Sequence, residues 1–363
     1  MMLSTMILKT GELGLTLQNS DGSMPKGHNG PYNDLETPVR NTAHWLFLFA
    51  FLFQKTKDAR WKDAGENAIN YLSSSDARPS GKTFYCRDTA GKDKCNGLIG
   101  QAWVIEALAK AAVAFNQKKY YQFAEEIFLL HPWDSQVGLW QRMEIDGRIL
   151  FFDDTFNHQL WFAAAGASLR RSPEIQYQVK KFIQKVASSI QLYPNGVIFH
   201  SSHMSRLFNY SHRGLRFFSM EAFSRLKKQK MWGELYSKSV GYHAFNLYAF
   251  AVLKQYFPNE KIWQSKDFEH IITAHRNKQF QMDLETSGSA FGYYYNISGI
   301  EIAYAIEIFY KNNPEAKLWL ERQLNMTYVD QSHILTGHAT DENTALARMY
   351  EAVRLTNDYE LQF

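Results

Sequence analysis

The 363-residue sequence has few cysteines, no long apolar run and no large excess of charge of one sign. Its most apolar stretch, Trp45–Phe53, is shorter than the roughly 20 residues that a membrane-spanning helix needs. The N-terminus has no basic segment before an apolar run, so we expect no signal peptide. The cysteines, Cys86 and Cys95, lie in one polar segment. A disulfide between them is geometrically feasible, but so low a count equally suits a reducing compartment, which we favour. These absences predict a cytoplasmic protein without a membrane span.

Charge and motifs exclude further classes of protein. The 40 basic and 36 acidic residues are spread along the chain, and a net charge of +4 gives little support for a nucleic-acid partner. The sequence has no phosphate-binding glycine loop, no nucleophile elbow and no dinucleotide fingerprint. Its histidines and cysteines do not follow a metal-ligand spacing. We therefore expect neither a cofactor nor a bound metal.

What the sequence has in abundance is helical periodicity, whereas strand patterns are rare. About twelve segments carry apolar residues at helical spacing, and they pair into hairpins with one long polar loop for each hairpin. We find no fixed repeat of a superhelical array, which is the alternative architecture. We predict one all-α domain over residues 1–363, an (α/α)6 barrel, with residues 1–40 as an N-terminal extension lining or closing the ring. The predicted helices are Asn41–Lys55, Arg60–Ser74, Gly97–Gln117, Lys119–Leu130, Asp153–Arg170, Pro173–Ile190, Arg213–Lys227, Val240–Tyr256, Lys261–Asn277, Ser298–Tyr310, Glu315–Asn325 and Asp341–Leu355.

The strongest local signal for chemistry is a pair of acids, Asp153 and Asp154, at a predicted helix start. Capping of the helix is the commoner explanation of such a pair. Here large aromatic residues follow, and a carboxyl among aromatic faces can keep a raised pKa and work as an acid near neutral pH. The two aspartates are therefore candidate catalytic acids, and Asn157, His158 and Trp161 are candidate substrate-binding residues.

Two further motifs place an imidazole near a predicted helix start. His338 precedes Asp341 and Glu342, whose carboxylates suit a helix N-terminus and are also candidates for substrate binding. Tyr242 and His243 are neighbours in another helix. A buried, satisfied histidine is the commoner outcome there, and a proton-transfer pair is the functional alternative. We keep His338, His243 and Tyr242 as candidate catalytic residues.

Two long loops supply the remaining polar candidates. One carries His212 and Arg213, and an arginine is well suited to binding the carboxylate of a uronic acid. The other ends in three consecutive tyrosines. It is either a turn with surface aromatics or a wall on which a sugar ring stacks, and aromatics make up 15% of the chain. Its candidate binding residues are Tyr293, Tyr294 and Asn296.

These motifs resemble those of carbohydrate-active enzymes built on (α/α)6 barrels. The paired aspartates before an aromatic helix resemble the acid motif of unsaturated glucuronyl and rhamnogalacturonyl hydrolases. In those enzymes an aspartate protonates the vinyl ether of an unsaturated uronate. The segments Asn96–Trp103, Gly241–Tyr248 and Asp341–Asn343 resemble proteins of the AglQ type from glycan-assembly clusters, proposed to process a hexuronic acid. The resemblance adds Asn96 and Trp103 to the candidate substrate-binding residues.

The Tyr-His motif is also similar to that of sugar epimerases on the same barrel, of the N-acylglucosamine 2-epimerase and glucuronyl C5-epimerase types. Three functions therefore stay open. The first, which we favour on the sequence, is a glycoside hydrolase of the unsaturated-uronyl type with one of the paired aspartates as its acid. The second is an epimerase or isomerase, and the third is a non-catalytic glycan-binding protein. In each case the expected partner is a saccharide, anionic in character, and the chain is a monomer or homodimer. The proton-transfer residues of the epimerase would come from Tyr242, His243, His338 and His212.

Overall fold

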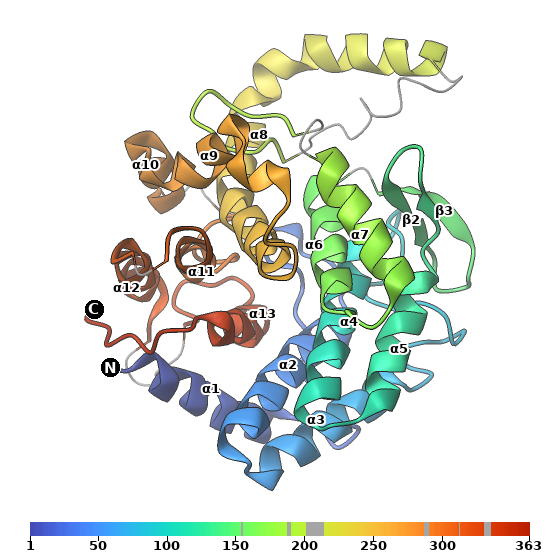
Figure 1. Cartoon of the computed structure of the whole chain (residues 1–363), viewed down its shortest axis with the longest axis vertical. Coiled ribbons are helices and arrows are strands. Elements are labelled where there is room, and N and C mark those ends of the chain that lie inside the picture. The colour runs from blue at the N-terminus through green and yellow to red at the C-terminus, as the bar shows by residue number, and fades with distance from the viewer. Residues whose placement is uncertain (154, 187–189, 201–213, 287–289, 312, 330–334) are drawn as a thin grey trace.

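The computed structural model describes residues 1–363 apart from 154, 187–189, 201–213, 287–289, 312 and 330–334; for 214–234 it describes the backbone. The chain forms a ring of helices, with an inner set around the axis and an outer set covering it (Figure 1). The predicted (α/α)6 barrel is confirmed. The inner helices are α2 (Val39–Thr56), α4 (Gly97–Ala114), α6 (Phe156–Ala167), α8 (Gly214–Tyr256), α11 (Ser298–Tyr310) and α13 (Glu342–Ala347), which continues as the 3-10 helix η5 (Arg348–Arg354). The outer elements are α1 (Leu3–Leu17), α3 (Ala59–Leu72), α5 (Lys118–Leu129), α7 (Pro173–Val186), η3 (Lys261–Gln264), α9 (Lys266–Thr273), η4 (Ala274–Arg276), α10 (Lys278–Glu285) and α12 (Glu315–Thr327).

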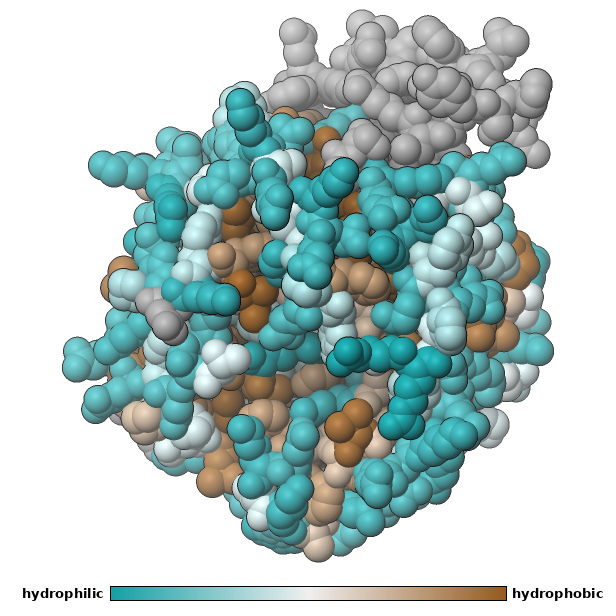
Figure 2. All heavy atoms as spheres, viewed as in Figure 1, coloured by the Kyte–Doolittle hydropathy of each residue, from teal (hydrophilic) through white to brown (hydrophobic). Residues whose placement is uncertain are grey.

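The division into inner and outer helices follows from how apolar residues are distributed around each helix. Helix α4 is buried on nearly all sides, as a helix that is hydrophobic all round must be. Helix α7 buries one stripe, which includes Ile175, Val179 and Phe182, and exposes the other. By length and composition α4 could cross a membrane, but 83% of it is buried inside the protein, as in a core helix. Hydrophilic side chains cover most of the face shown in Figure 2.

The ring is closed by its two chain ends. The Met1 amino group donates a hydrogen bond to the Leu361 carbonyl (2.7 Å), and the Leu361 N–H donates to the Met1 carbonyl (2.9 Å). Helix α1 packs against α2 and η5 and so serves as an outer helix. The N-terminal 40 residues comprise one helix of the ring, followed by a loop that contributes residues to the pocket at one end of it.

Two local predictions were wrong. The segment between α5 and α6 is not a plain loop. It forms a three-stranded antiparallel sheet in the order β1 (Trp133–Asp134), β2 (Leu139–Met143), β3 (Ile149–Phe152). Gly138 and Gly147, both with positive φ, make its turns. Helix α8 is one continuous helix where two segments were predicted.

Cys86 and Cys95 are separate buried thiols, and burial raises the pKa of each.

The inner helices run in the same direction around the ring. The first residues of α2, α4 and α6 face one cavity, and the last residues of the same helices face another at the opposite end. Each helix N-terminus carries about half a positive charge and each C-terminus about half a negative charge. The two ends of the ring therefore differ in electrostatic potential before any side chain is considered.

Candidate functional site

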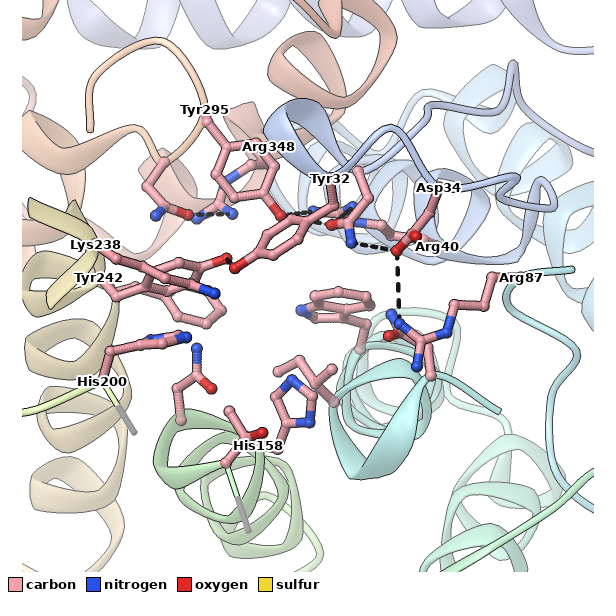
Figure 3. Close-up of a pocket in the computed structure, with 18 of the residues that line it drawn as sticks. Tyr32, Asp34, Arg40, Arg87, His158, His200, Lys238, Tyr242, Tyr295 and Arg348 are labelled. Carbon is pink, nitrogen blue, oxygen red and sulfur yellow. Dashed lines mark hydrogen bonds and ion pairs between the residues drawn. The ribbon is translucent and has the colours of Figure 1, made fainter. Parts of the chain in front are cut away.

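A pocket of about 260 Å³ lies at the end of the ring where the inner helices begin (Figure 3). Three inner helices contribute residues from their first turns, and further residues come from just before α11 and from the start of η5. Six of the residues predicted from the sequence line this pocket, and they come from four separate segments of the chain. They are Asn96, Trp103, Asn157, His158, Tyr242 and Asn296.

Asp153 and His158 form a hydrogen-bonded pair at the pocket wall. Asp153 Oδ2 lies 2.8 Å from His158 Nδ1 and accepts a hydrogen bond from the Leu98 N–H at the start of α4 (2.9 Å). Its other oxygen accepts from the Thr155 N–H (3.2 Å). This geometry assigns the His158 proton to Nδ1 and leaves Nε2 as the atom that can act in the pocket.

The electrostatics of Asp153 contradict the expected raised pKa. Burial acts to raise the pKa of this carboxyl, but the charge and hydrogen bond of His158, together with the Leu98 N–H, outweigh it and lower the pKa. Asp153 is therefore an ionised group that holds His158, and its own oxygens are occupied. The other predicted acid, Asp154, lies outside the described residues.

The pair depends on a close approach at Gly97, the first residue of α4. Gly97 has φ +60°, and a Cβ at this position would lie 2.3 Å from Asp153 Oδ2 and 2.8 Å from His158 Nδ1. A glycine is needed here for both its backbone conformation and its lack of a side chain. Asn96 also has a left-handed backbone and lines the pocket, and its side chain does not cap α4. Carboxylates from elsewhere accept from the first N–H groups of that helix.

A second histidine, His200, lines the pocket on another wall. Its ring lies 4.3 Å from that of Tyr242, and its buried Nδ1 has no hydrogen-bond partner among the described residues. Burial, followed by the charges of Lys238 and His158, holds the pKa of His200 well below its ordinary value, so this imidazole is neutral. The buried Asn157 Oδ1 likewise has no partner within the part of the chain that is described. Both atoms are suited to a ligand that brings its own hydrogen-bonding groups.

Tyr242 was predicted as a catalytic residue and does reach the pocket. Its hydroxyl donates to the Tyr32 hydroxyl (3.0 Å), and burial followed by the neighbouring tyrosines raises its pKa well above the ordinary value. It is a protonated phenol whose ring lies beside His200.

His243, the next residue in the sequence, is buried away from the pocket, and the prediction of a catalytic role conflicts with its hydrogen bonding. His243 Nδ1 accepts from the Ile198 N–H (3.2 Å) and Nε2 donates to the Ile271 carbonyl (3.1 Å).

The other predicted residues lie outside the pocket lining. His338 and Tyr294 contact each other edge to face, at 5.8 Å. Asp341 caps α13 by accepting from the Thr344 N–H, and it also accepts from the His28 and Gly30 N–H groups of the N-terminal loop. Trp161 stacks on Phe245, a pocket residue, at 4.5 Å and thus supports the wall from behind. Glu342 is exposed, Tyr293 is buried elsewhere, and His212 and Arg213 lie outside the described residues.

The pocket is rich in cations, which sequence reasoning missed. Five lysine and arginine side chains line it, against one described carboxylate, that of Asp34. Arg40 pairs with Glu36 at 2.9 Å, and both side chains are buried. The remaining ion pairs are those of Arg348 with Glu301 (2.5 Å) and Glu351 (2.8 Å), of Lys92 with Asp34 (2.5 Å), and of Arg87 with Asp93 (2.9 Å) and Asp34 (3.5 Å).

A signal for some of the missed residues was present in the sequence. The segment Asn19–Arg40 is one of the long loops, and it contributes Tyr32, Asp34 and Arg40 to the pocket. If long loops share one face, this loop belongs to the site as well. Lys238 and Arg348 carried no such signal, because a charged residue inside a helical pattern is usually on the solvent face.

No protein-family model matches this chain. The archaeal glycosylation protein Q of Haloferax volcanii is 40% identical over 370 residues, which cover 99% of this chain and 98% of that protein. The solved structure of a D-mannose isomerase superposes with a TM-score of 0.63 at 14% identity, covering 97% of this chain and 95% of the other.

Two further solved structures show the same fold. A cellobiose 2-epimerase from Bacillus thermoamylovorans has a TM-score of 0.65 at 10% identity, covering 97% of this chain and 99% of the other. An α-1,6-mannanase from a Salegentibacter species, solved with α-1,6-mannotriose as a variant described as inactive, has a TM-score of 0.57 at 11% identity and covers 97% and 98%. At these identities the likeness establishes the fold alone.

Proposed function

Since the chain belongs to the family of the archaeal glycosylation protein Q, we propose that it is a carbohydrate-active enzyme, and that it epimerises or isomerises an anionic sugar by proton transfer. One observation carries the proposal. A histidine held by a carboxylate, His158, shares a pocket with a second, neutral histidine, His200. In Figure 3 the His200 ring lies beside Tyr242 at the left of the pocket, and the His158 ring lies apart from it at the lower centre.

The Asp153–His158 pair supplies a base. Because Asp153 holds the Nδ1 proton, Nε2 carries the lone pair that can accept a proton from a carbon next to a carbonyl or carboxylate. The imidazolium that forms is stabilised by the ionised Asp153 behind it. His200, on another wall beside the Tyr242 phenol, is the candidate for handling the proton returned to that carbon. A proton leaves and a proton returns, so the reaction needs neither oxidant nor reductant.

The charge of the pocket supports an anionic substrate, in line with the uronic acid expected from the sequence. The N-termini of α2, α4 and α6 meet at this end, and each adds partial positive charge to that of the basic side chains. The buried thiols Cys86 and Cys95 support our further proposal of a reducing, cytoplasmic location.

A glycoside hydrolase is the second candidate, and a specific observation favours it. The inactive mannanase variants solved with mannooligosaccharides each have two consecutive aspartates replaced, and this chain also has consecutive aspartates at 153 and 154. Against this, a glycosidase needs two carboxyl groups flanking the bond. In the described part of the pocket lining the single carboxylate, Asp34, is held by Lys92 and Arg87.

Solvent exchange separates the two candidates. The protein is incubated with D-glucuronate, D-galacturonate and D-mannuronate in D2O, and the recovered sugars are analysed by NMR and mass spectrometry. We expect deuterium in the recovered sugar without cleavage, and we expect both Asp153→Asn and His158→Gln to abolish it. A protein that releases unsaturated uronate from a disaccharide and exchanges no carbon-bound hydrogen is a hydrolase, and our proposal is then wrong.

A further inference from the structure

Lys238, in the middle of α8, differs from every other cation of the pocket. Each of the four others lies within ion-pair distance of at least one carboxylate. Lys238 has no carboxylate partner among the described residues, although it lines the same pocket. Its ammonium group lies instead over two aromatic rings, 4.6 Å from the centroid of Tyr32 and 5.4 Å from that of Phe291. Aromatic faces hold a cation in place and leave its charge without a counterion.

Burial and a neighbouring lysine destabilise the charged form of Lys238. Burial, together with the charge of Lys92, lowers the pKa of Lys238 to about 8. Lys92 lies over the same Tyr32 ring at 5.6 Å, but its own charge is matched by Asp34 at 2.5 Å. A bound oxyanion next to Lys238 would remove the mismatch, because it would supply the counterion that is missing among the described residues of the pocket wall.

Lys238 and the second histidine flank the same part of the pocket. The Ser239 hydroxyl, one residue along α8, accepts a hydrogen bond from the backbone N–H of His200 at 3.0 Å. The charge of Lys238 is one of the causes that lower the pKa of His200. Tyr242, one turn further along α8, contacts the His200 ring at 4.3 Å. Figure 3 shows Lys238, Tyr242 and His200 together on one side of the pocket.

We propose that Lys238 binds the carboxylate of a hexuronate, and that this places C5 of the sugar, the carbon bearing the carboxylate, beside the histidines as the site of proton exchange. The inference rests on the proposed function and adds to it the reacting carbon and the residue that selects it. Lys238 is a catalytic residue in this scheme because it touches the substrate.

The chemistry gives the lysine a role that a neutral residue cannot fill. A base removes the C5 hydrogen as a proton, and the electron pair of the C–H bond moves into the carboxylate, which becomes a dianionic enediolate. The Lys238 ammonium pairs with the charge that develops there. A proton returned to the opposite face of C5 completes the inversion, and nothing is oxidised or reduced. A sugar without the carboxylate has neither the anchor nor the acidic C–H group.

The test uses methyl β-D-glucuronide, a ring-locked uronate that cannot open to an aldehyde and so cannot exchange at C2. The full-length protein is incubated with it in D2O, and deuterium is located by NMR. We expect deuterium at C5. In parallel, calorimetry measures the Kd for methyl β-D-glucuronide and for methyl β-D-glucoside, which lacks the carboxylate. We expect Lys238→Met to weaken glucuronide binding by about 10- to 100-fold and to leave glucoside binding unchanged.

Two further variants control the experiment. Lys238→Arg keeps the charge and should restore much of the glucuronide affinity. Lys254→Met removes a lysine of the same helix that is not part of the pocket lining, and it should bind as the wild type does. If Lys238→Met binds both glycosides as the wild type does, the carboxylate site is elsewhere and the inference is overturned.

The outcomes also separate this inference from the proposed function. Exchange at C2 of free D-glucuronate, with none at C5 of the methyl glycoside, overturns the assignment of the carbon and leaves the proposed epimerase or isomerase standing. Absence of exchange from every uronate overturns the proposed function itself. The binding measurements then still decide whether Lys238 recognises a carboxylate.

Discussion

Both ends of the ring carry basic side chains, but the helix ends that surround those side chains have opposite partial charges. The end opposite the pocket has a cavity of about 550 Å³ lined by Lys55, Lys110, Arg354 and one carboxylate, Glu106. The C-termini of α2, α4, α6 and α8 surround it, and together they contribute about two negative charges, which the surplus basic side chains offset. At the pocket end the helix N-termini add to the basic side chains instead.

The comparison shows that a count of lysines and arginines does not identify an anion site. Helix direction decides whether a cation neutralises a charge already present or adds to one. At the far end Arg354 pairs with Glu106, and Lys110, which donates to the Gln54 amide oxygen, lies where the helix C-termini supply negative charge. At the pocket end, Lys238 has no carboxylate partner in the part of the chain that is described, and it lies where helix N-termini add positive charge. Substitutions at each end test whether the two ends of the ring act separately.

The largest effect should come from the imidazole at the pocket end. His158→Gln removes the base held by Asp153, so we expect the rate of solvent exchange per folded molecule to fall by about 10²- to 10⁴-fold. His338→Gln is the matched control, because His338 contacts Tyr294 and is not part of the pocket lining. Equal losses of rate in the two variants would contradict the assignment.

The same kind of change at the far end should affect stability and not the reaction. Glu106→Gln leaves the largely buried Arg354 guanidinium without its counterion, so we expect the free energy of unfolding to fall by about 3 kcal/mol. Denaturant unfolding measures this loss. The rate per folded molecule should match the wild type, and a variant that is stable but slow would mean that the two ends are coupled.

Gly97→Ala should produce a mixed and smaller effect. The left-handed backbone at residue 97 costs an alanine about 1–2 kcal/mol of stability, and the added methyl collides with Asp153 and His158. We expect a modest fall in the unfolding midpoint together with slower exchange. Gly81→Ala has a similar positive φ with open space around it, so it should show the stability loss alone.

The smallest effect is a dependence on pH. Lys238 has a pKa of about 8 in the free protein, and a bound carboxylate raises it. The affinity for methyl β-D-glucuronide should therefore be constant below pH 8 and fall by up to about tenfold per pH unit above it. Lys110, at the far end, also has a pKa lowered to about 8, by burial and by its cationic neighbours. If Lys110→Met removes the pH dependence, the anion binds at the wrong end for our proposal.

Much of the fold was predictable because its determinants are local. Apolar periodicity defined the hairpins, and the long loops indicated a shared functional end. The sheet β1–β3 was missed because its strands are too short to show a clear alternation of apolar and polar residues. Its Asp146-Gly147 turn was the available signal.

The candidate site was less predictable because its residues act through distant partners. The sequence indicated Asp153 and His158, but the lowered pKa of Asp153 depends on a contact with the start of another helix. Conversely, the sequence made His243 a candidate catalytic residue. Only the structure shows that its two ring nitrogens bond to the backbone of Ile198 and Ile271. Lys238 could be recognised only once the pocket was assembled, because what distinguishes it is the lack of a carboxylate among its described neighbours.

The hydrogen bonds that join Met1 to Leu361 span 360 residues of sequence, and they have a topological consequence. A ring sealed by its own ends has no privileged starting point, because any outer turn could serve equally well as the break. Linking the paired ends and opening the chain at the α4–α5 turn would yield a circular permutant with the same set of neighbours around the pocket. The connectivity that creates the site is thus cyclic, and the order in which the segments are synthesised is incidental to it.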